Sequence, residues 1–276
     1  MHTIRIATEL DPKWLNSVRG KRLDDRHYTR VIGDQDVNVV DGRGVTVLAL
    51  RKAAVCSEVA LDAYPHLLPA VTLTHTRPDA QGDAKELWSG TVGYTHKTPR
   101  KYTRTRPDSW ERLLPLFAGM DAAFRRELPD QYRKLVEADV DPGCRIPGTP
   151  FTTGTVNYWD RHHNARMGAH HDKGNLPGSM GVMTVIRGGE YKGGLLVFPR
   201  YRVAVDLGSC DLLIADNTEL HGNTAVESNG EWSRVSVVAF VHASNLRDGR
   251  GSRQVAKSSP PSGCAPRCSA GGSEAR

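Results

Sequence analysis

Two histidines and one aspartate in the second half of the chain have the types and spacing of a metal-binding set. His170 and Asp172 are two residues apart, so a strand would direct both side chains to one face, whereas His171 would point the other way. His221 follows after several predicted strands. Two imidazoles and one carboxylate bind three positions of an iron ion and leave the others open, as in non-haem Fe(II) oxygenases. We therefore expect His170, Asp172 and His221 to be the catalytic metal ligands.

The pattern alone leaves other interpretations open. A His-x-Asp triplet is expected about once by chance in a chain of this length and composition, and an isolated histidine is more often a surface or core residue than a ligand. Zinc also accepts histidine and carboxylate ligands, so a hydrolytic zinc site fits the same three residues. The strand that follows His221 favours iron, because it carries groups suited to binding a carboxylate co-substrate.

The segment 234–242 alternates between two faces, as a strand with one buried side does. One face carries Val235, Val237, Ala239 and Val241, and the other carries Arg234, Ser236, Val238, Phe240 and His242. A solvated face would rarely keep Val238 and Phe240 between polar groups, so we expect the second face to line a cavity. Arg234 can form two parallel bonds to a carboxylate, and Ser236 can donate one more. Phe240 can stack on a planar ring whose edge His242 can hydrogen-bond.

The composition is that of one globular domain. The chain has 276 residues, of which 38% are hydrophobic and 25% are charged. Its apolar runs are too short to cross a bilayer, its N-terminus shows no signal-peptide pattern, and its five cysteines are scattered and odd in number. We expect a cytoplasmic monomer with no membrane partner; for a phage-encoded protein the compartment is the bacterial host cell.

Most of the net charge of +6 comes from the end of the chain. Residues 247–276 contain six cations and two acids, which gives +4, and they are rich in Ser, Gly and Pro. Such a segment is expected to be a disordered basic tail, so the basic character of the chain is weak evidence for nucleic-acid binding. The segment 96–106 has five cations and no acid, and it is either a phosphate-contacting loop or a solvated one.

The pattern along the chain predicts an α+β fold with its chemistry in the second half. Before residue 150 we expect a hairpin over 37–50, a short helix over 52–61, and a helix from Trp110 capped by Asp108 or Ser109. Short β-type runs separated by turn residues follow at 153–158, 180–186, 194–198, 201–206, 211–215 and 234–242, which is typical of a jelly roll. We predict one domain over 1–246, in which a double-stranded β-helix core at 151–246 is flanked by the helices of an N-terminal α/β elaboration over 1–150.

With these residues the chain resembles the TET/JBP family of DNA-base dioxygenases, loosely over 30–245 and well over 151–242. The resemblance implies a double-stranded β-helix enzyme that uses Fe(II), O2 and 2-oxoglutarate, with ascorbate as reductant. Such an enzyme oxidises the 5-methyl group of 5-methylcytosine or thymine in DNA. The resemblance places iron on His170, Asp172 and His221, and 2-oxoglutarate on Arg234 and Ser236.

The same resemblance implies which residues contact the base after it is flipped out of the DNA. Asn175 stands three residues after Asp172, and Phe240 and His242 stand six and eight residues after Arg234, as base-contacting residues do in that family. Val238 lies on the same predicted strand face as Phe240, and we expect it to contact the base as well. The leading hypothesis is hydroxylation of 5-methylcytosine in DNA to 5-hydroxymethylcytosine.

Several alternatives share features of this pattern. Asn157-Tyr158-Trp159 is similar to the strand of 2-oxoglutarate contacts in AlkB-like DNA demethylases, so Asn157 is a further candidate for binding the co-substrate. Arg166, four residues before His170, is another candidate and is equally suited to a surface salt bridge. A thymine hydroxylase of the JBP type and a small-molecule hydroxylase would use the same iron site. A cupin-like binding module would have the same fold without turnover.

Overall fold

A large mixed sheet is the main element of the computed structural model, which describes residues 2–6, 12–75, 86–163 and 167–247. Its strands lie in the order β1 (His2–Arg5), β3 (Val37–Val40), β4 (Thr46–Arg51), β13 (Leu212–Ala215), β9 (Gly181–Gly189), β16 (Trp232–Phe240), β8 (Thr153–Asp160), β6 (Glu86–Thr95) and β5 (Thr72–His75), with β7 (Thr98–Pro99) beside β6. Strand β16 pairs antiparallel with β9 on one side and β8 on the other, which places it in the middle of the sheet.

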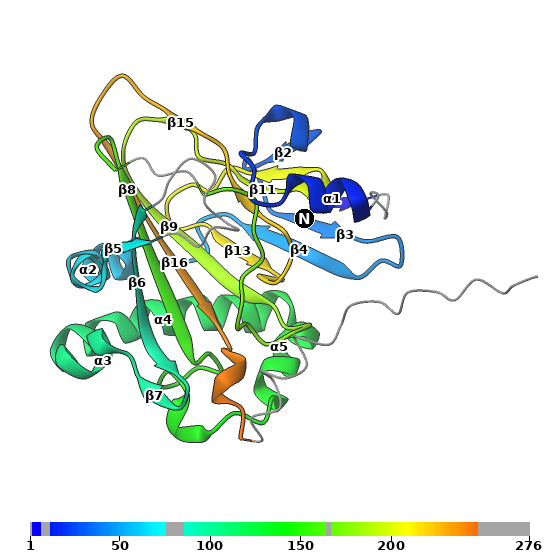
Figure 1. Ribbon diagram of the computed structural model, residues 1–276. Helices are drawn as coiled ribbons and strands as arrows, with labels where there is room; N and C mark the ends of the chain where they lie inside the picture. The colour runs from blue at the N-terminus through cyan, green and yellow to red at the C-terminus, as the bar shows by residue number, and fades with distance from the viewer. Residues whose placement is uncertain (1, 7–11, 76–85, 164–166, 248–276) are drawn as a thin grey trace, which may run out of the picture.

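A smaller sheet faces one portion of the large one (Figure 1). Its strands lie in the order β14 (Gly222–Asn223), β11 (Leu196–Phe198), β12 (Val203–Val205) and β2 (Arg30–Ile32), and β10 (Lys192–Gly193) pairs separately with β15 (Val226–Glu227). Phe198 and Val205 of the small sheet share one apolar cluster with Leu50 and Leu213 of the large sheet. Two sheets packed face to face in this way form the double-stranded β-helix (jelly roll) predicted from the strand pattern, and the fold class is α+β.

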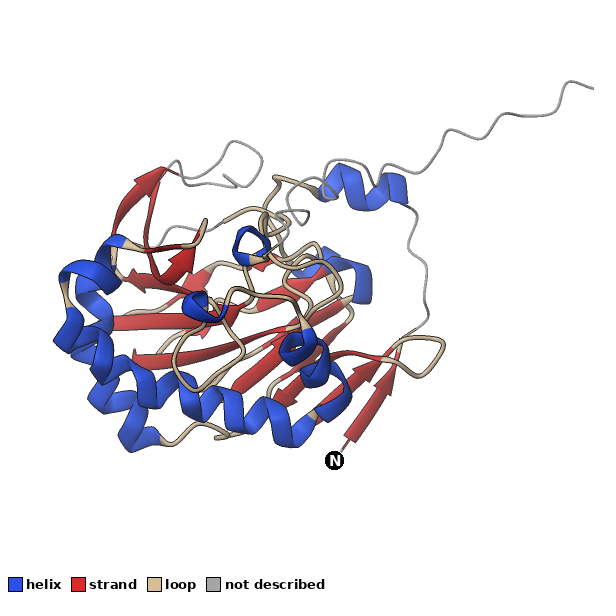
Figure 2. Cartoon of the chain, turned by 90° about the horizontal axis from the view of Figure 1, so that it is seen from below, coloured by secondary structure: helices blue, strands red, loops and turns tan. Residues whose placement is uncertain are grey.

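Helices cover the other face of the large sheet. Four of them, α2 (Ser57–Leu67), α3 (Lys101–Thr105), α4 (Pro107–Glu127) and α5 (Pro129–Glu137), gather on that side, whereas α1 (Pro12–Val18) lies near the small sheet (Figures 1 and 2). Phe117 and Met120 of α4 are fully buried and belong to one core with Val235 and Val237 of β16. This packing turns the opposite face of β16 toward the space between the sheets. No helix among the described residues is long and apolar enough to cross a membrane.

The N-terminal elements differ in detail from the prediction. The hairpin over 37–50 is confirmed, because β3 and β4 pair antiparallel. Helix α2 begins at Ser57 rather than at Lys52, since the carboxylate of Asp211 accepts hydrogen bonds from the Lys52 ammonium at 2.5 Å and from the Ala53 backbone N–H at 2.9 Å. These two bonds hold the chain in a turn before the helix.

The long helix α4 begins earlier than the predicted Trp110. Its first residue is Pro107, whose fixed φ suits the first turn of a helix and whose missing N–H needs no partner there. Neither Asp108 nor Ser109 caps it, and Arg106 stands at the N-cap position. The N-terminal half also contributes β3, β4 and β6 directly to the sheet that contains the predicted core strands.

Candidate active site

His170 and His221 are brought together by a short backbone pairing between two loops. The His170 N–H donates to the His221 carbonyl at 2.8 Å, and the His221 N–H donates back at 3.0 Å. Their ring centroids are 4.6 Å apart, and Nε2 of His170 lies 3.5 Å from Oδ1 of Asp172. One ligand atom from each of His170, Asp172 and His221 lies within 4.8 Å of the other two. Three donors of these types at this spacing fit a single divalent iron.

Backbone carbonyls accept hydrogen bonds from Nδ1 of both histidines, the ring nitrogen that does not face the metal site. Nδ1 of His170 lies 2.9 Å from the Gly168 carbonyl oxygen, and Nδ1 of His221 lies 2.8 Å from that of Glu219. Because a carbonyl only accepts, each Nδ1 carries the proton and each Nε2 keeps its lone pair for a metal. Burial, followed by the nearby His170, lowers the pKa of His221, which favours the neutral ring that binds metals.

His171 does not belong to this group of ligands. Its Nδ1 lies 2.7 Å from the carbonyl oxygen of Thr218 and is engaged in that hydrogen bond. Among the described residues, the group that could hold a metal ion is His170, Asp172 and His221, without His171. The strand expected at 170–172 is wrong, because His170 forms an isolated bridge in a loop; His170 and Asp172 nevertheless converge, and His171 is directed to Thr218.

A cavity of about 410 Å³ opens beside the three ligands, between the two sheets. Its wall includes side chains from β6, β8, β9, β11, β13 and β16. From β16 these are Ser236, Val238 and Phe240, three of the five residues expected to face a cavity, whereas Arg234 and His242 are not among the lining residues. Val235 and Val237 of the same strand belong to the core under the helices. The middle of this strand therefore separates its two faces as the sequence predicts.

A row of polar side chains crosses three neighbouring strands on the cavity wall. Ser89 of β6, Asn157 of β8 and Ser236 of β16 are aligned by the strand register. The Ser89 hydroxyl donates to Oδ1 of Asn157 at 2.8 Å, and Nδ2 of Asn157 lies 3.4 Å from Oγ of Ser236. This row directs the two predicted contacts, Asn157 and Ser236, into the cavity. Sequence reasoning misses Ser89, because the pattern along the chain does not predict β6 in the sheet.

Arg234 is buried behind the cavity wall and is not among the residues that line it. Its side chain is 3% exposed, its guanidinium lies 5.3 Å from the ring centroid of the wall residue Trp159, and Nη1 donates to the Gly194 carbonyl at 2.7 Å. Nε of Arg234 is buried without a hydrogen-bond partner in the described residues. Burial lowers the pKa of this guanidinium, yet an arginine stays charged in proteins.

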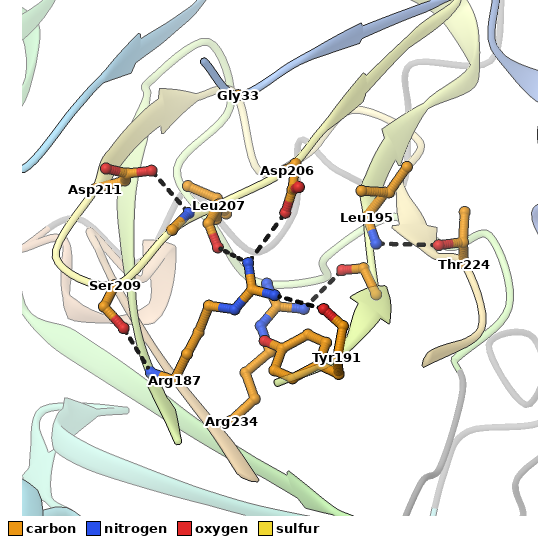
Figure 3. A network of polar contacts seen from close by, with 12 residues as sticks. Gly33, Arg187, Tyr191, Leu195, Asp206, Leu207, Ser209, Asp211, Thr224 and Arg234 are labelled. Carbon is orange, nitrogen blue, oxygen red and sulfur yellow. Dashed lines mark hydrogen bonds and ion pairs between the residues drawn. The ribbon is translucent and has the colours of Figure 1, made fainter. Parts of the chain in front are cut away.

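A second arginine lies beside the first on the neighbouring strand. Arg187 of β9 is the register partner of Arg234, and Figure 3 shows the two side chains extending into one region next to Tyr191. Arg187 forms an ion pair with Asp206, in which Nη1 lies 3.2 Å from Oδ1. Its guanidinium also stacks on Tyr191, 4.0 Å from the ring centroid. No such ion pair is found for Arg234 within the described ranges. A buried cation with a free N–H fits a carboxylate supplied by a bound molecule.

The predicted base-contacting residues meet near the C-terminal end of β16. Asn175 lines it, is 5% exposed, and has a buried Nδ2 without a hydrogen-bond partner among the residues that the structure describes. Its backbone forms an isolated antiparallel bridge with His242, whose ring centroid lies 6.3 Å from that of Phe240. His242 itself is not among the lining residues and is half-buried at the edge. Arg166, predicted as a co-substrate contact, lies outside the described residues.

Two further asparagines face the cavity and were not predicted. Asn217 and Asn223 both line it, and Nδ2 of Asn217 is buried without a partner among the described residues. Asn217 follows β13 closely, and its carbonyl accepts the Asp172 N–H at 3.4 Å. Asn223 lies two residues after His221 and so points the same way. The spacing from His221 is the one signal in the sequence that could have indicated Asn223.

The comparisons with known proteins agree with this geometry. Residues 88–243 match the model of the family Tet_JBP, described as the oxygenase domain of the 2OGFeDO superfamily. Thymine dioxygenase JBP1 of Trypanosoma brucei brucei is 30% identical over 229 residues, which cover 75% of this chain and 26% of that protein. The bifunctional helicase and thymine dioxygenase JBP2 of Leishmania infantum is 30% identical over 212 residues, covering 73% and 19%.

A solved structure, NgTET1 in complex with 5mC DNA, has a similar fold. Its TM-score is 0.58 at 13% identity, and the match covers 86% of this chain and 93% of that one. The chain spans about a quarter of the length of the curated JBP1 relative. The likeness to the solved structure supports the arrangement of sheets and helices described above.

Proposed function

The chain belongs to the Tet_JBP family, the oxygenase domain of the 2OGFeDO superfamily, and on that premise we propose that it hydroxylates the 5-methyl group of a pyrimidine in DNA. Membership makes it an oxidoreductase of the dioxygenase class with Fe(II) and 2-oxoglutarate. The observation that carries the proposal is one cavity that joins the three converging ligands to Asn175 and Phe240.

The residues present fit the metal and the co-substrate. His170, Asp172 and His221 would hold the iron, which with 2-oxoglutarate and O2 supplies the oxidising power for a methyl C–H bond. Ser236, Asn157 and Ser89 offer hydroxyl and amide groups on the wall beside it. Arg234 would neutralise the remote carboxylate of 2-oxoglutarate, because its buried Nε has no partner within the described residues. The role of Arg234 is thus to orient the co-substrate.

The part of the cavity near Phe240 and Asn175 suits a flat polar ring. A methyl group inside a duplex is out of reach of a buried site, so the base must leave the helix at a cost of a few kcal/mol. Stacking on the Phe240 ring would return about 1–3 kcal/mol of this cost. Val238 lies beside Phe240 on the same wall and would contact the apolar edge of the base.

We propose 5-methylcytosine as the base, because Nδ1 of His242 accepts the Ser244 N–H and the ring therefore presents an Nε2–H donor, which N3 of 5-methylcytosine can accept. Thymine is the second candidate. Both bases present a methyl group at the same ring position, so the iron site alone does not distinguish them. Thymine is favoured by one observation: the buried Nδ2 of Asn175, unpartnered within the described ranges, can donate to an oxygen at the 4-position. Cytosine carries an amino group there, which needs the amide oxygen of Asn175 instead. The relatives named as thymine dioxygenases keep this second candidate open.

A basic surface next to His242 supports DNA as the partner. Lys97, Arg100, Lys101 and Arg104 are exposed, and no ion pair neutralises them within the described residues. The His96 ring lies 5.8 Å from that of His242, so this surface adjoins the base-contacting edge of the cavity. Cations in this position would hold phosphates near the flipped nucleotide.

Succinate release tests the proposal against its rivals. The protein is incubated with Fe(II), ascorbate and 2-oxoglutarate, alone and with 5-methylcytosine DNA, unmethylated DNA or free amino acids. We expect succinate formation to be stimulated by the DNA substrates. Stimulation by free amino acids alone would identify a small-molecule hydroxylase, and formaldehyde release from N-methylated DNA would identify an AlkB-like demethylase. No succinate under any condition would indicate a binding module.

A further inference from the structure

His242 is held from behind by Ser244. The Ser244 backbone N–H donates to Nδ1 of His242 at 3.2 Å, and Oγ of Ser244 lies 2.7 Å from the same nitrogen. A backbone N–H can only donate, so Nδ1 must be the acceptor and carries no proton. The remaining proton of the neutral ring is therefore on Nε2.

The Ser244 hydroxyl is itself oriented by the β6–β7 turn. The His96 backbone N–H donates to Oγ of Ser244 at 2.7 Å, which leaves the hydroxyl proton free to donate to Nδ1 of His242. Three groups thus form a directed series: the His96 amide, the Ser244 hydroxyl and the His242 ring. Each bond in this series favours the same tautomer, with the proton on Nε2.

The turn that supplies the His96 amide is fixed to the segment after β16. His96 and Lys97 both have positive φ, at 52° and 54°, as the two central residues of a tight hairpin turn do. The Lys97 N–H donates to Oδ1 of Asn245 at 2.9 Å, and Nδ2 of Asn245 donates to the Tyr94 carbonyl at 2.8 Å. Asn245 itself is fully buried, so its side chain is held in one position by these two bonds. The turn and Ser244 therefore keep a fixed relation.

The surroundings of His242 also favour a neutral ring. Burial lowers its pKa to about 4, and the nearby His96 and Arg100 act in the same direction. The element packed against its other side contributes Gly174, where an added Cβ would lie 2.5 Å from Nε2 of His242, and Asn175, and neither is charged. No carboxylate is among the causes of the shift.

We propose that Ser244 is a positioning residue that fixes His242 as an Nε2–H donor to the substrate base. This inference rests on the proposed function. A donor at that atom pairs with N3 of 5-methylcytosine, which has a lone pair where thymine carries N3–H; the 2-oxo group is common to both bases. The other tautomer would present a lone pair and would instead accept from N3–H of thymine. Ser244 therefore contributes to the preference for 5-methylcytosine over thymine.

The test compares Ser244→Ala with Ser244→Thr, which keeps the hydroxyl and serves as the matched control. We expect Ser244→Ala to raise KM for 5-methylcytosine DNA by roughly 2- to 10-fold, the loss of one hydrogen bond. KM for 2-oxoglutarate should not change, turnover of 5-methylcytosine relative to thymine should fall, and Ser244→Thr should behave as wild type. Kinetics of Ser244→Ala identical to wild type would overturn the proposal.

Nitrogen NMR of the His242 ring in the wild-type protein gives a readout that is independent of activity. We expect the Nε2–H tautomer at neutral pH. In Ser244→Ala the backbone N–H still donates to Nδ1 while the hydroxyl bond is lost, so we expect the same main tautomer with a weaker preference for it. An Nδ1–H tautomer or an imidazolium in an active wild-type protein would overturn this inference alone. An Nε2–H tautomer in a protein that oxidises no DNA base would overturn the proposed function and, with it, the role of Ser244 in base recognition.

Discussion

Replacing Arg234 by lysine tests the region of the site that should bind 2-oxoglutarate. The substitution keeps a positive charge but removes the planar fork, including the Nε–H that has no partner in the described structure. Lysine is also a more strongly hydrated cation, and the position is only 3% exposed. We therefore expect weaker co-substrate binding rather than loss of the iron site, because His170, Asp172 and His221 lie on other segments.

The size of the effect follows from the bonds that are lost. A hydrogen bond to a charged group contributes about 1.5–3 kcal/mol, and each 1.4 kcal/mol corresponds to a factor of ten in affinity. Loss of one such bond to the far carboxylate should raise KM for 2-oxoglutarate by roughly 10- to 150-fold. Metal affinity should stay within a few-fold of wild type.

Arg187 offers a matched control on the adjacent strand. Arg187→Lys changes a guanidinium at the register partner of Arg234, but Arg187 already pairs with Asp206, whose side chain is 50% exposed. A pair exposed to this degree contributes about 0–1 kcal/mol. The assay is succinate formation at varied 2-oxoglutarate with saturating iron and DNA. An unchanged KM in Arg234→Lys, or an equal rise in both variants, would refute the assignment of Arg234.

Three further predictions concern the substrate side. Phe240→Ala should lower DNA oxidation by roughly 5- to 150-fold, because stacking of about 1–3 kcal/mol is lost, while iron binding is unchanged. Phe240→Tyr, which keeps the ring, is the control, and unchanged activity of the alanine variant would refute stacking. The triple alanine variant of Lys97, Arg100 and Lys101 should reduce the slope of log DNA affinity against log salt concentration by up to about 3. Fluorescence anisotropy with labelled DNA measures this slope, and an unchanged slope would show that this surface lies away from the phosphates. His242 should titrate with a pKa near 4 in the folded protein by NMR, below its ordinary 6.5, because burial disfavours the charged ring. As pH falls, the unfolded chain takes up this proton near pH 6.5, whereas the folded protein takes it up near pH 4. His242 therefore lowers the stability of the folded state progressively between about pH 6.5 and 4, and it has no such effect above pH 6.5. A midpoint near 6.5 in the folded protein would contradict the burial argument.

The spacing of His170 and Asp172 and the two faces of β16 could be predicted because they depend on local rules. The period of two along a strand separates Val237 from Val238 on β16. The approach of His221 to His170 depends instead on a bridge between distant loops.

Other features depend on contacts between distant segments. Ser89 reaches the cavity only because β6 pairs with β8, and Gly90 and Gly93 within β6 weaken any strand pattern that the sequence could show. Arg234 lies behind Trp159 rather than on the cavity wall, since the Gly194 carbonyl draws its guanidinium into a buried position. Period and composition carry no information on either relation.

Mass spectrometry of nucleosides from treated DNA shows whether this site oxidises a 5-methylated pyrimidine. Duplexes that contain 5-methylcytosine, or thymine as the sole 5-methylated pyrimidine, are incubated with wild type or Asp172→Ala, Fe(II), ascorbate and 2-oxoglutarate, and then digested. We predict 5-hydroxymethylcytosine with wild type, dependent on both iron and 2-oxoglutarate, and none with Asp172→Ala; 5-hydroxymethyluracil as the sole product would select the thymine alternative. Unmodified nucleosides alongside steady consumption of 2-oxoglutarate, or equal product from Asp172→Ala, would rule out hydroxylation of DNA at this iron site.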